Sequence, residues 1–239
     1  MDVQENLNIF MFGKGKSKGR YQIERYSSYD YCFNYFRSFF ESNKLYELCS
    51  PKNIQMSCLQ LGFYLASWGM YRGSSFLLQK SIKIYEPLIK LISEMDVRFW
   101  KIDVDNYSES NLQLLIDCYK KIEISLEEEE RSVTQTLITK IMLVVFGSVP
   151  AFDEFFRKGM KVYNFNKNSL QKIREFHIKH KNDLEEAIIN FNLKIKNKRD
   201  RKIYTFNFIT GKESRYYYTK AKLIDMVCLV EGKEMKNKK

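Results

Sequence analysis

Apolar residues recur along most of this chain at the three- and four-residue intervals of amphipathic helices. The intervals predict helices, in chain order, over residues 29–48, 53–79, 81–97, 112–122, 131–146, 169–193 and 214–230. Gly69 and Gly73 predict a bend in the second of these segments, because a glycine inside a helix costs about 1 kcal/mol relative to alanine. Residues 203–209 alternate as a strand does and precede the turn-forming Thr210-Gly211-Lys212, so one hairpin is expected.

These elements indicate a mainly α protein. We expect a compact multi-helix domain, formed as one lobe or as two helical lobes with a cleft, and at most one small hairpin. Three prolines and ten glycines in 239 residues are few helix breakers, which supports this assignment. The expected organisation is a flexible basic arm over residues 1–28, a single helical domain over 29–232 and a basic tail over 233–239.

The charge balance points to a polyanionic partner. Lysine and arginine number 40 against 29 acidic residues, for a formal net charge of +11. Such a surplus is typical of proteins that bind nucleic acid or an anionic membrane surface. No uncharged apolar run is long enough to span a bilayer, and the N-terminus lacks the pattern of a signal peptide, so we expect DNA and no membrane as partner.

Cysteine usage indicates the compartment and argues against a metal. The five cysteines are scattered, and none belongs to a Cys-x-x-Cys pair. This pattern indicates reduced thiols in a cytoplasmic protein and does not fit a zinc or iron–sulfur site. We therefore expect neither a metal nor a cofactor. Basic side chains expected to contact phosphates are Lys14, Lys16, Lys18, Arg20, Lys140, Lys198 and Arg199.

A single carboxylate stands out near the middle of the chain. The apolar run 137–146 stops at Gly147, a Ser-Val-Pro turn follows, and Asp153 then lies in the first turn of a new amphipathic helix. An acid at that position caps the helix in many proteins. In a basic protein, and among aromatic residues, it can also stabilise a cation that develops during chemistry on nucleic acid.

Residues 139–147, followed by Val149-Pro150-Ala151-Phe152-Asp153, resemble the catalytic region of the helix-hairpin-helix DNA glycosylases, most closely their 8-oxoguanine-glycosylase-like branch. The resemblance covers about a quarter of the chain. It implies that Asp153 faces the sugar of a flipped nucleotide. It also implies an enzyme that excises a damaged or modified base, in DNA repair or in defence against phages with modified DNA.

The chain departs from that family at two points. Residues 133–136 replace the Pro-Gly-x-Gly hairpin. The position of the family's imine-forming lysine falls at Thr136 or Leu137, one helical turn before Lys140. The resemblance therefore implies a monofunctional glycosylase, one without lyase chemistry through a lysine.

A base-excising enzyme needs an aromatic pocket beside its acid, because the target base must leave the stack. The segment around Trp68 is the candidate, and it is faintly similar to a Trp-Gly-containing segment of some family members. The expected stacking residues are Trp68, Tyr64 and Tyr71, and the expected polar contacts to the base are Arg72, Ser74 and Ser75. Core packing is the alternative role for Trp68.

Two other functions remain open from the sequence. One is a non-catalytic helical nucleic-acid-binding protein that uses the basic N-terminal residues and the stretch 194–202 on phosphates. The other is a helical ribonuclease that uses Arg174 and His180, whose spacing matches a loose pattern of toxin ribonucleases. A further acid, Asp225, lies on an apolar helix face and is expected to pair with Lys222 or with an arginine.

Overall fold

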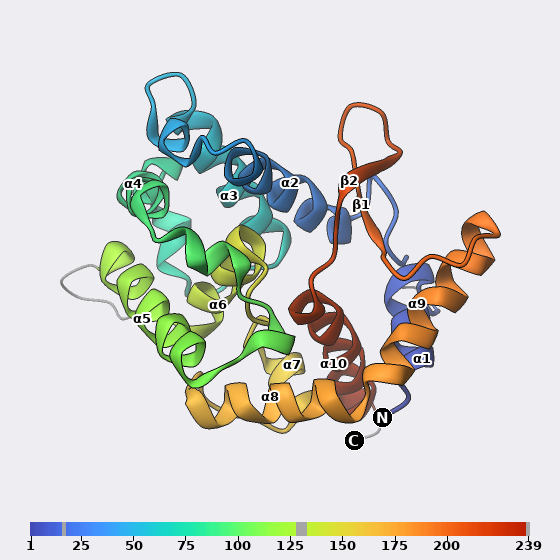
Figure 1. Cartoon of the computed structure of the whole chain (residues 1–239). Helices are drawn as coiled ribbons and strands as arrows, with labels where there is room; N and C mark the ends of the chain where they lie inside the picture. The colour runs from blue at the N-terminus through green and yellow to red at the C-terminus, as the bar shows by residue number, and fades with distance from the viewer. Residues whose placement is uncertain (16–17, 128–132, 238–239) are drawn as a thin grey trace.

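Helix α6 (Gln135–Phe146) lies in the middle of the molecule (Figure 1). Its residues 137–146 are all buried, and a helix that is apolar on every side needs neighbours on every side. Helices α2 (Ser28–Glu41), α3 (Ile54–Ser67) and α5 (Glu109–Leu126) contact it directly. The helix therefore forms the centre of the core.

The computed structural model describes residues 1–15, 18–127 and 133–237. These residues form ten α-helices and one two-stranded hairpin, which confirms the expected mainly α class. The other helices are α1 (Val3–Phe12), α4 (Glu86–Glu94), α7 (Glu154–Met160), α8 (Lys167–Lys179), α9 (Lys181–Lys196) and α10 (Lys220–Asn237). Short 3-10 helices join them: η1 (Arg25–Ser27), η2 (Leu45–Cys49), η3 (Phe76–Gln79), η4 (Ile82–Tyr85), η5 (Val97–Lys101) and η6 (Val104–Asn106).

The buried apolar side chains of the described residues form one continuous cluster that takes in α1 to α10. Helix α10 packs against α7 and α1, and α1 packs in turn against α9 (Figure 1). On the other side of α6, α3 and α5 both contact α4. No helix in the described part of the chain has the length and apolar character needed to cross a bilayer.

The N-terminal segment is not the flexible arm that its composition suggested. Asp2 caps α1 by accepting the N–H of Glu5, and Val3, Leu7 and Phe10 of α1 are buried in the core. Burying these side chains removes their apolar surface from water, which holds the helix against α10. The expected tail from residue 233 is likewise the last part of α10, as far as Asn237. Residues 238–239 lie outside the described part.

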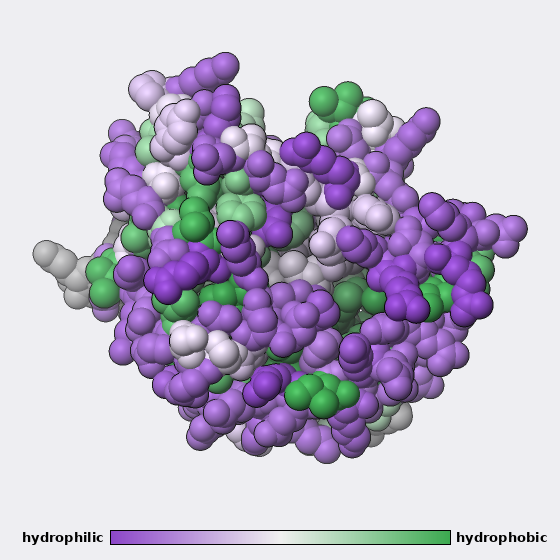
Figure 2. All heavy atoms as spheres, viewed as in Figure 1, coloured by the Kyte–Doolittle hydropathy of each residue, from purple (hydrophilic) through white to green (hydrophobic). Residues whose placement is uncertain are grey.

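Two element boundaries also differ from the sequence expectation. The segment 169–193 forms two helices, α8 and α9, which meet at His180. The residues expected to begin the last helix form strand β2 (Glu213–Tyr217), which pairs antiparallel with β1 (Tyr204–Phe206). The hairpin itself is confirmed. Figure 2 shows a hydrophobic patch at its tip, on a face that is otherwise mostly hydrophilic.

Candidate functional site

The loop that carries Asp153 is fixed by three hydrogen bonds, two from α6 and one from α10. Thr139 Oγ1 accepts the N–H of Phe152 at 2.8 Å, and Thr136 Oγ1 donates to the carbonyl of the same residue at 3.0 Å. Asp225 Oδ1 accepts the N–H of Ala151 at 3.0 Å from the side of α10. Buried backbone groups that are paired in this way hold a loop in one conformation. Asp153, the N-cap residue of α7, is therefore held in one position.

Asp153 caps its own helix and also faces a pocket. Its Oδ1 accepts the N–H of Phe156 at 2.9 Å and caps α7. Its Oδ2 lies 4.0 Å from Nζ of Lys140, and the side chain is 16% exposed. Asp153 is one of the residues that line a pocket between α3, α6, α7 and α10. Capping uses one carboxylate oxygen, so it does not prevent the other from acting on a bound ligand.

Lys140 was expected to contact phosphates, and the structure corrects this. The side chain is buried, because its position on α6 directs it into the protein. Its Nζ donates to the carbonyl oxygen of Trp68 at 2.7 Å. Burial lowers the pKa of the Lys140 amine from its ordinary value, and the nearby carboxylates of Asp153 and Asp225 oppose that shift. Lys140 is therefore a buried cation in the lining of the pocket and not a surface contact for phosphates.

The pocket has a volume of about 720 Å³, within the range of roughly 300–1,000 Å³ that is usual for small-ligand sites. It lies between the end of α3, the central helix α6, the start of α7 and the last turns of α10. The residues that line it are Arg25, Ala66, Ser67, Trp68, Gly69, Met70, Tyr71, Arg72, Thr136, Lys140, Asp153, Glu154, Phe155, Leu229, Lys233 and Lys236. Five of these side chains are cationic and two are carboxylates, so the site favours an anionic ligand.

Trp68 forms an aromatic wall of this pocket. Its ring stacks on Tyr26 at a centroid distance of 5.4 Å, and the Nζ atoms of Lys222 and Lys140 lie 5.1 and 5.9 Å from its centroid. The indole Nε1 is buried and has no hydrogen-bond partner among the described residues. A tryptophan held by an aromatic ring and a buried cation keeps a fixed orientation. Its partly buried ring forms part of the pocket lining.

The structure brings only part of the predicted base-binding set together. Trp68, Tyr71 and Arg72 line the pocket with Asp153. Tyr64, Ser74 and Ser75 are not among the described residues that line it. Tyr64 is buried and packs edge-on against the ring of Tyr29 at 6.3 Å, so it belongs to the core. Ser75 caps η3, and Ser74 is exposed.

Of the two partners expected for Asp225, Lys222 or an arginine, the structure shows Lys222. Their Nζ and Oδ2 atoms are 2.9 Å apart, and both side chains are about 2% exposed. Burial raises the pKa of the Asp225 carboxyl, Lys222 opposes this, and the charge of Asp153 adds to it. Asp225 also binds the N–H of Ala151. It is therefore a support of the loop that carries Asp153.

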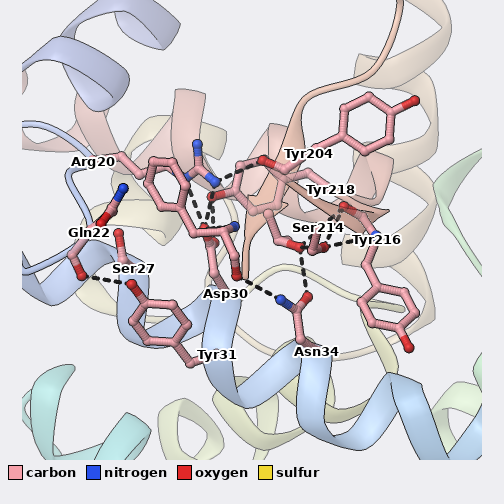
Figure 3. A network of polar contacts seen from close by, with 12 residues as sticks. Arg20, Gln22, Ser27, Asp30, Tyr31, Asn34, Tyr204, Ser214, Tyr216 and Tyr218 are labelled. Atoms are coloured by element: carbon pink, nitrogen blue, oxygen red, sulfur yellow. Dashed lines mark hydrogen bonds and ion pairs between the residues drawn. The ribbon is translucent and has the colours of Figure 1, made fainter. Parts of the chain in front are cut away.

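Arg20 is another expected phosphate contact that lies in the interior. Its guanidinium forms a two-pronged contact with Asp30, from Nε at 3.0 Å and from the terminal nitrogen at 2.5 Å (Figure 3). Both side chains are almost fully buried. Lys14, Lys18, Lys198 and Arg199 are exposed as expected, although Lys14 and Lys18 lie near carboxylates of Glu234 and Glu24. Lys16 lies outside the described residues.

Arg174 and His180, the residues of the ribonuclease alternative, are not among the residues that line the pocket with Asp153. Arg174 is exposed on α8, and Nδ1 of His180 lies 2.8 Å from a carboxylate oxygen of Asp183. His177 is buried, and burial together with the charge of Lys220 lowers its pKa. No cluster of three or more metal-binding side chains occurs in the described part of the chain.

Sequence reasoning missed the cationic rim of the pocket. Arg25 belongs to the segment expected to be a loose arm, and Lys233 and Lys236 belong to the segment expected to fray. No local pattern marks these residues, because tertiary packing brings them to Asp153, and for the two lysines this is the packing of α10 against α7. Comparisons with protein-family models, with curated proteins and with solved structures find no match to this chain. A functional proposal therefore depends on the chemistry of this site.

Proposed function

We propose that this protein is a monofunctional DNA glycosylase that flips a damaged or modified base into the pocket and excises it with the help of Asp153. One observation carries the proposal: a carboxylate, an indole ring and a cationic rim face the same pocket. The indole ring can contact a flipped base, and the cationic rim can bind the flanking phosphates. The carboxylate can stabilise positive charge on the sugar between them. A role in repair or in defence against phages with modified DNA is compatible with this activity.

The chemistry follows from the charge that develops during the reaction. As the bond between C1′ and the base nitrogen breaks, the bonding electrons leave with the base and the sugar becomes cationic. The Asp153 carboxylate stabilises that cation, and its Oδ2 can orient the attacking water. The water oxygen bonds to C1′ and its proton leaves, while the departing base gains a proton. The products are a free base and an abasic site.

The substitution Asp153→Asn tests the proposal without removing the helix cap. Asparagine caps helices as well as aspartate does, so the fold and DNA binding should persist. We expect base release to fall at least about a hundredfold, the usual cost of removing one electrostatic contact to the transition state. The measurement is the appearance of abasic sites in varied genomic DNAs, including phage DNA with modified bases.

The matched control is Glu154→Gln, which removes the adjacent carboxylate from the same pocket. Glu154 is bound to Lys158 at 2.6 Å, and we expect its substitution to leave base release within about a fewfold of the unmodified protein. If the unmodified protein binds DNA but produces no abasic sites in any of these substrates, the proposal fails. The non-catalytic binding function would then stand in its place.

A further inference from the structure

A second hollow in the molecular surface lies between the hairpin and the helices α2 and α3. It has a volume of about 940 Å³ and is lined by residues from the segments 31–38, 59–63 and 207–216. We call it the hairpin groove. None of the described residues that line it also lines the pocket that contains Asp153. The hairpin groove is therefore a separate surface, and the proposed base excision assigns no role to it.

Aromatic rings occur on both walls of the hairpin groove. Tyr31 and Tyr35 belong to α2, and Phe63 belongs to α3. Phe208 and Tyr216 line the groove from the hairpin. Phe63 is 68% exposed and Phe208 is 78% exposed, so both rings present flat apolar surface to water. Unpaired nucleobases stack on such rings with little regard to sequence, because every base has a flat face.

The rings of α2 are fixed in place by the groove itself. The hydroxyl of Tyr31 donates to the carbonyl oxygen of Gln22 at 2.8 Å (Figure 3), and its ring meets the ring of Phe208 edge-on at a centroid distance of 5.2 Å. The hydroxyl of Tyr35 shares a hydrogen bond of 2.9 Å with Oγ of Ser57. Side chains that are already held lose little freedom when a ligand binds, which favours binding at this surface.

Amide side chains lie among these rings. Gln60 of α3 and Asn207 of the hairpin both line the groove. Asn207 holds the turn in one conformation, because its Oδ1 accepts the N–H groups of Ile209 and Thr210 at 3.0 and 2.9 Å. An amide has both a donor and an acceptor, which match the mixed donors and acceptors on the edge of an unpaired base. The groove thus offers polar partners as well as flat apolar surface.

The charges of the hairpin groove are complementary to a phosphate backbone. Arg215 lines the groove with 66% of its side chain exposed. Its Nε lies 3.8 Å from a carboxylate oxygen of Glu41, and an exposed pair of this kind is weak enough to yield to a ligand. Among the described residues, Glu213 is the one acid that lines the groove, and Nζ of Lys196 neutralises it at 2.8 Å. A phosphate can therefore approach Arg215 without meeting an unpaired carboxylate in the lining.

We propose that the hairpin groove binds a short stretch of single-stranded nucleic acid, whose unpaired bases stack on Phe63 and Phe208 while Arg215 contacts the backbone. The bases of a duplex are paired and stacked on one another, so their faces cannot reach rings inside a hollow. An apolar segment of another protein fits less well, because amides and an arginine lie among the rings and the chain has a net charge of +11. This binding goes beyond base excision and does not require it.

The test measures the fluorescence anisotropy of a labelled single strand of about 15 nucleotides, prepared as DNA and as RNA. The double variant Phe63→Ser/Phe208→Ser should bind at least about tenfold more weakly than the unmodified protein, since two stacking surfaces are lost. This ratio should persist at high salt, because stacking is not screened. Loss of binding with either strand supports the proposal, and the tighter strand identifies the ligand. Serine and phenylalanine have similar helix propensities, so α3 should persist, which far-UV circular dichroism checks.

The matched control is Tyr46→Ser/Tyr163→Ser, which removes two aromatic rings that are 66% and 79% exposed and that line neither the groove nor the pocket. It should bind the strand as the unmodified protein does. A strand of the same length built from abasic sugar–phosphate units should bind the unmodified protein and the groove variant equally. The proposal is disproved if the groove variant binds like the control, or if the unmodified protein binds the abasic strand as tightly as the complete one.

The groove and the glycosylase proposal can fail separately. Asp153→Asn should bind the single strand as tightly as the unmodified protein, because Asp153 does not line the groove. If no substrate yields abasic sites but the groove variant loses the strand, the groove proposal stands and the glycosylase proposal fails. If base is released but the groove variant keeps the strand, the reverse holds. Vesicles rich in phosphatidylserine test a membrane as the other anionic surface, and their loss by a groove variant that still binds the strand would overturn the groove proposal.

Discussion

At the scale of single residues, Asp153 and Lys140 show how one side chain serves both fold and site. Asp153 caps α7 with one oxygen and presents the other toward Lys140. Lys140 binds the carbonyl of Trp68, so it fixes the end of α3 as well as the charge of the pocket. Because the same atoms support packing and line the pocket, a substitution here is informative only when it keeps the structural contact.

The amine of Lys140 gives a test of the monofunctional mechanism. An imine needs an amine that can reach C1′ of the sugar, whereas Nζ of Lys140 is held by the carbonyl oxygen of Trp68 and lies 4.0 Å from the carboxylate of Asp153. The position where the resembled family has its lysine is occupied by Thr136 or Leu137. We expect that borohydride traps no covalent complex with DNA under conditions that release base. A trapped complex that disappears in Lys140→Met would show lyase chemistry instead.

At the scale of elements, the crossing of α7 and α10 decides where the acid and the cationic rim meet. Gly159 of α7 faces the backbone of Cys228, and Gly232 of α10 faces the backbone of Phe155. A Cβ atom at either glycine would overlap the carbonyl oxygen opposite. The two helices therefore touch backbone to backbone, with a glycine from each side. This close approach brings Lys233 and Lys236 to the mouth of the pocket.

Replacing either glycine of the crossing should separate the two helices. We expect Gly159→Ala and Gly232→Ala each to lower the free energy of unfolding by about 1–3 kcal/mol or more, since a backbone carbonyl cannot move aside as a side chain can. Urea unfolding measures this. Gly62→Ala in α3 is the control, because its Cβ would meet only side-chain atoms of Ile82 and Tyr85 at 3.3 Å. Equal stability of all three variants would contradict the backbone contact.

At the scale of the whole molecule, the cations behind the net charge of +11 have two different roles, depending on whether they are buried or exposed. Arg20, Lys140 and Lys222 are buried and act inside the protein. The exposed cations that border the pocket, among them Arg72 and Lys236, are placed to act on a ligand. Under the proposed function, the total charge steers the protein toward DNA, whereas the position of the exposed cations decides how the DNA lies.

This distribution predicts a specific salt dependence. DNA affinity should fall linearly with salt on a double-logarithmic plot, because bound phosphates release counterions. Arg72→Gln/Lys236→Gln should reduce the slope by about 2, since each phosphate that is no longer neutralised accounts for roughly 0.9. The control Lys172→Gln/Lys179→Gln changes two exposed lysines of α8 that do not border the described pocket. The idea is wrong if both variants have the same slope.

Features that depend on near neighbours in the chain could be predicted from the sequence. Helical periodicity indicated the mainly α class and the helix that ends at Phe146, and the turn residues indicated the hairpin. The apolar face around Asp225 predicted that this acid needs a cationic partner, and Lys222, one of the two expected partners, is close because residues three apart on a helix share a face. Asp153 was recognised as the start of a helix for the same local reason.

Contacts between distant residues were settled by the packing of the helices instead. Residues 213–217 form a strand because they pair with β1 and because Tyr218, the next residue, is bound to Asp30 of α2, although their local pattern favoured a helix. Helix α1 joins the core because α9 and α10 cover its apolar face. Arg25, Lys140, Asp153 and Lys236 surround one pocket although they lie far apart in the chain. Burial and long-range hydrogen bonds select these contacts, and no local spacing encodes them.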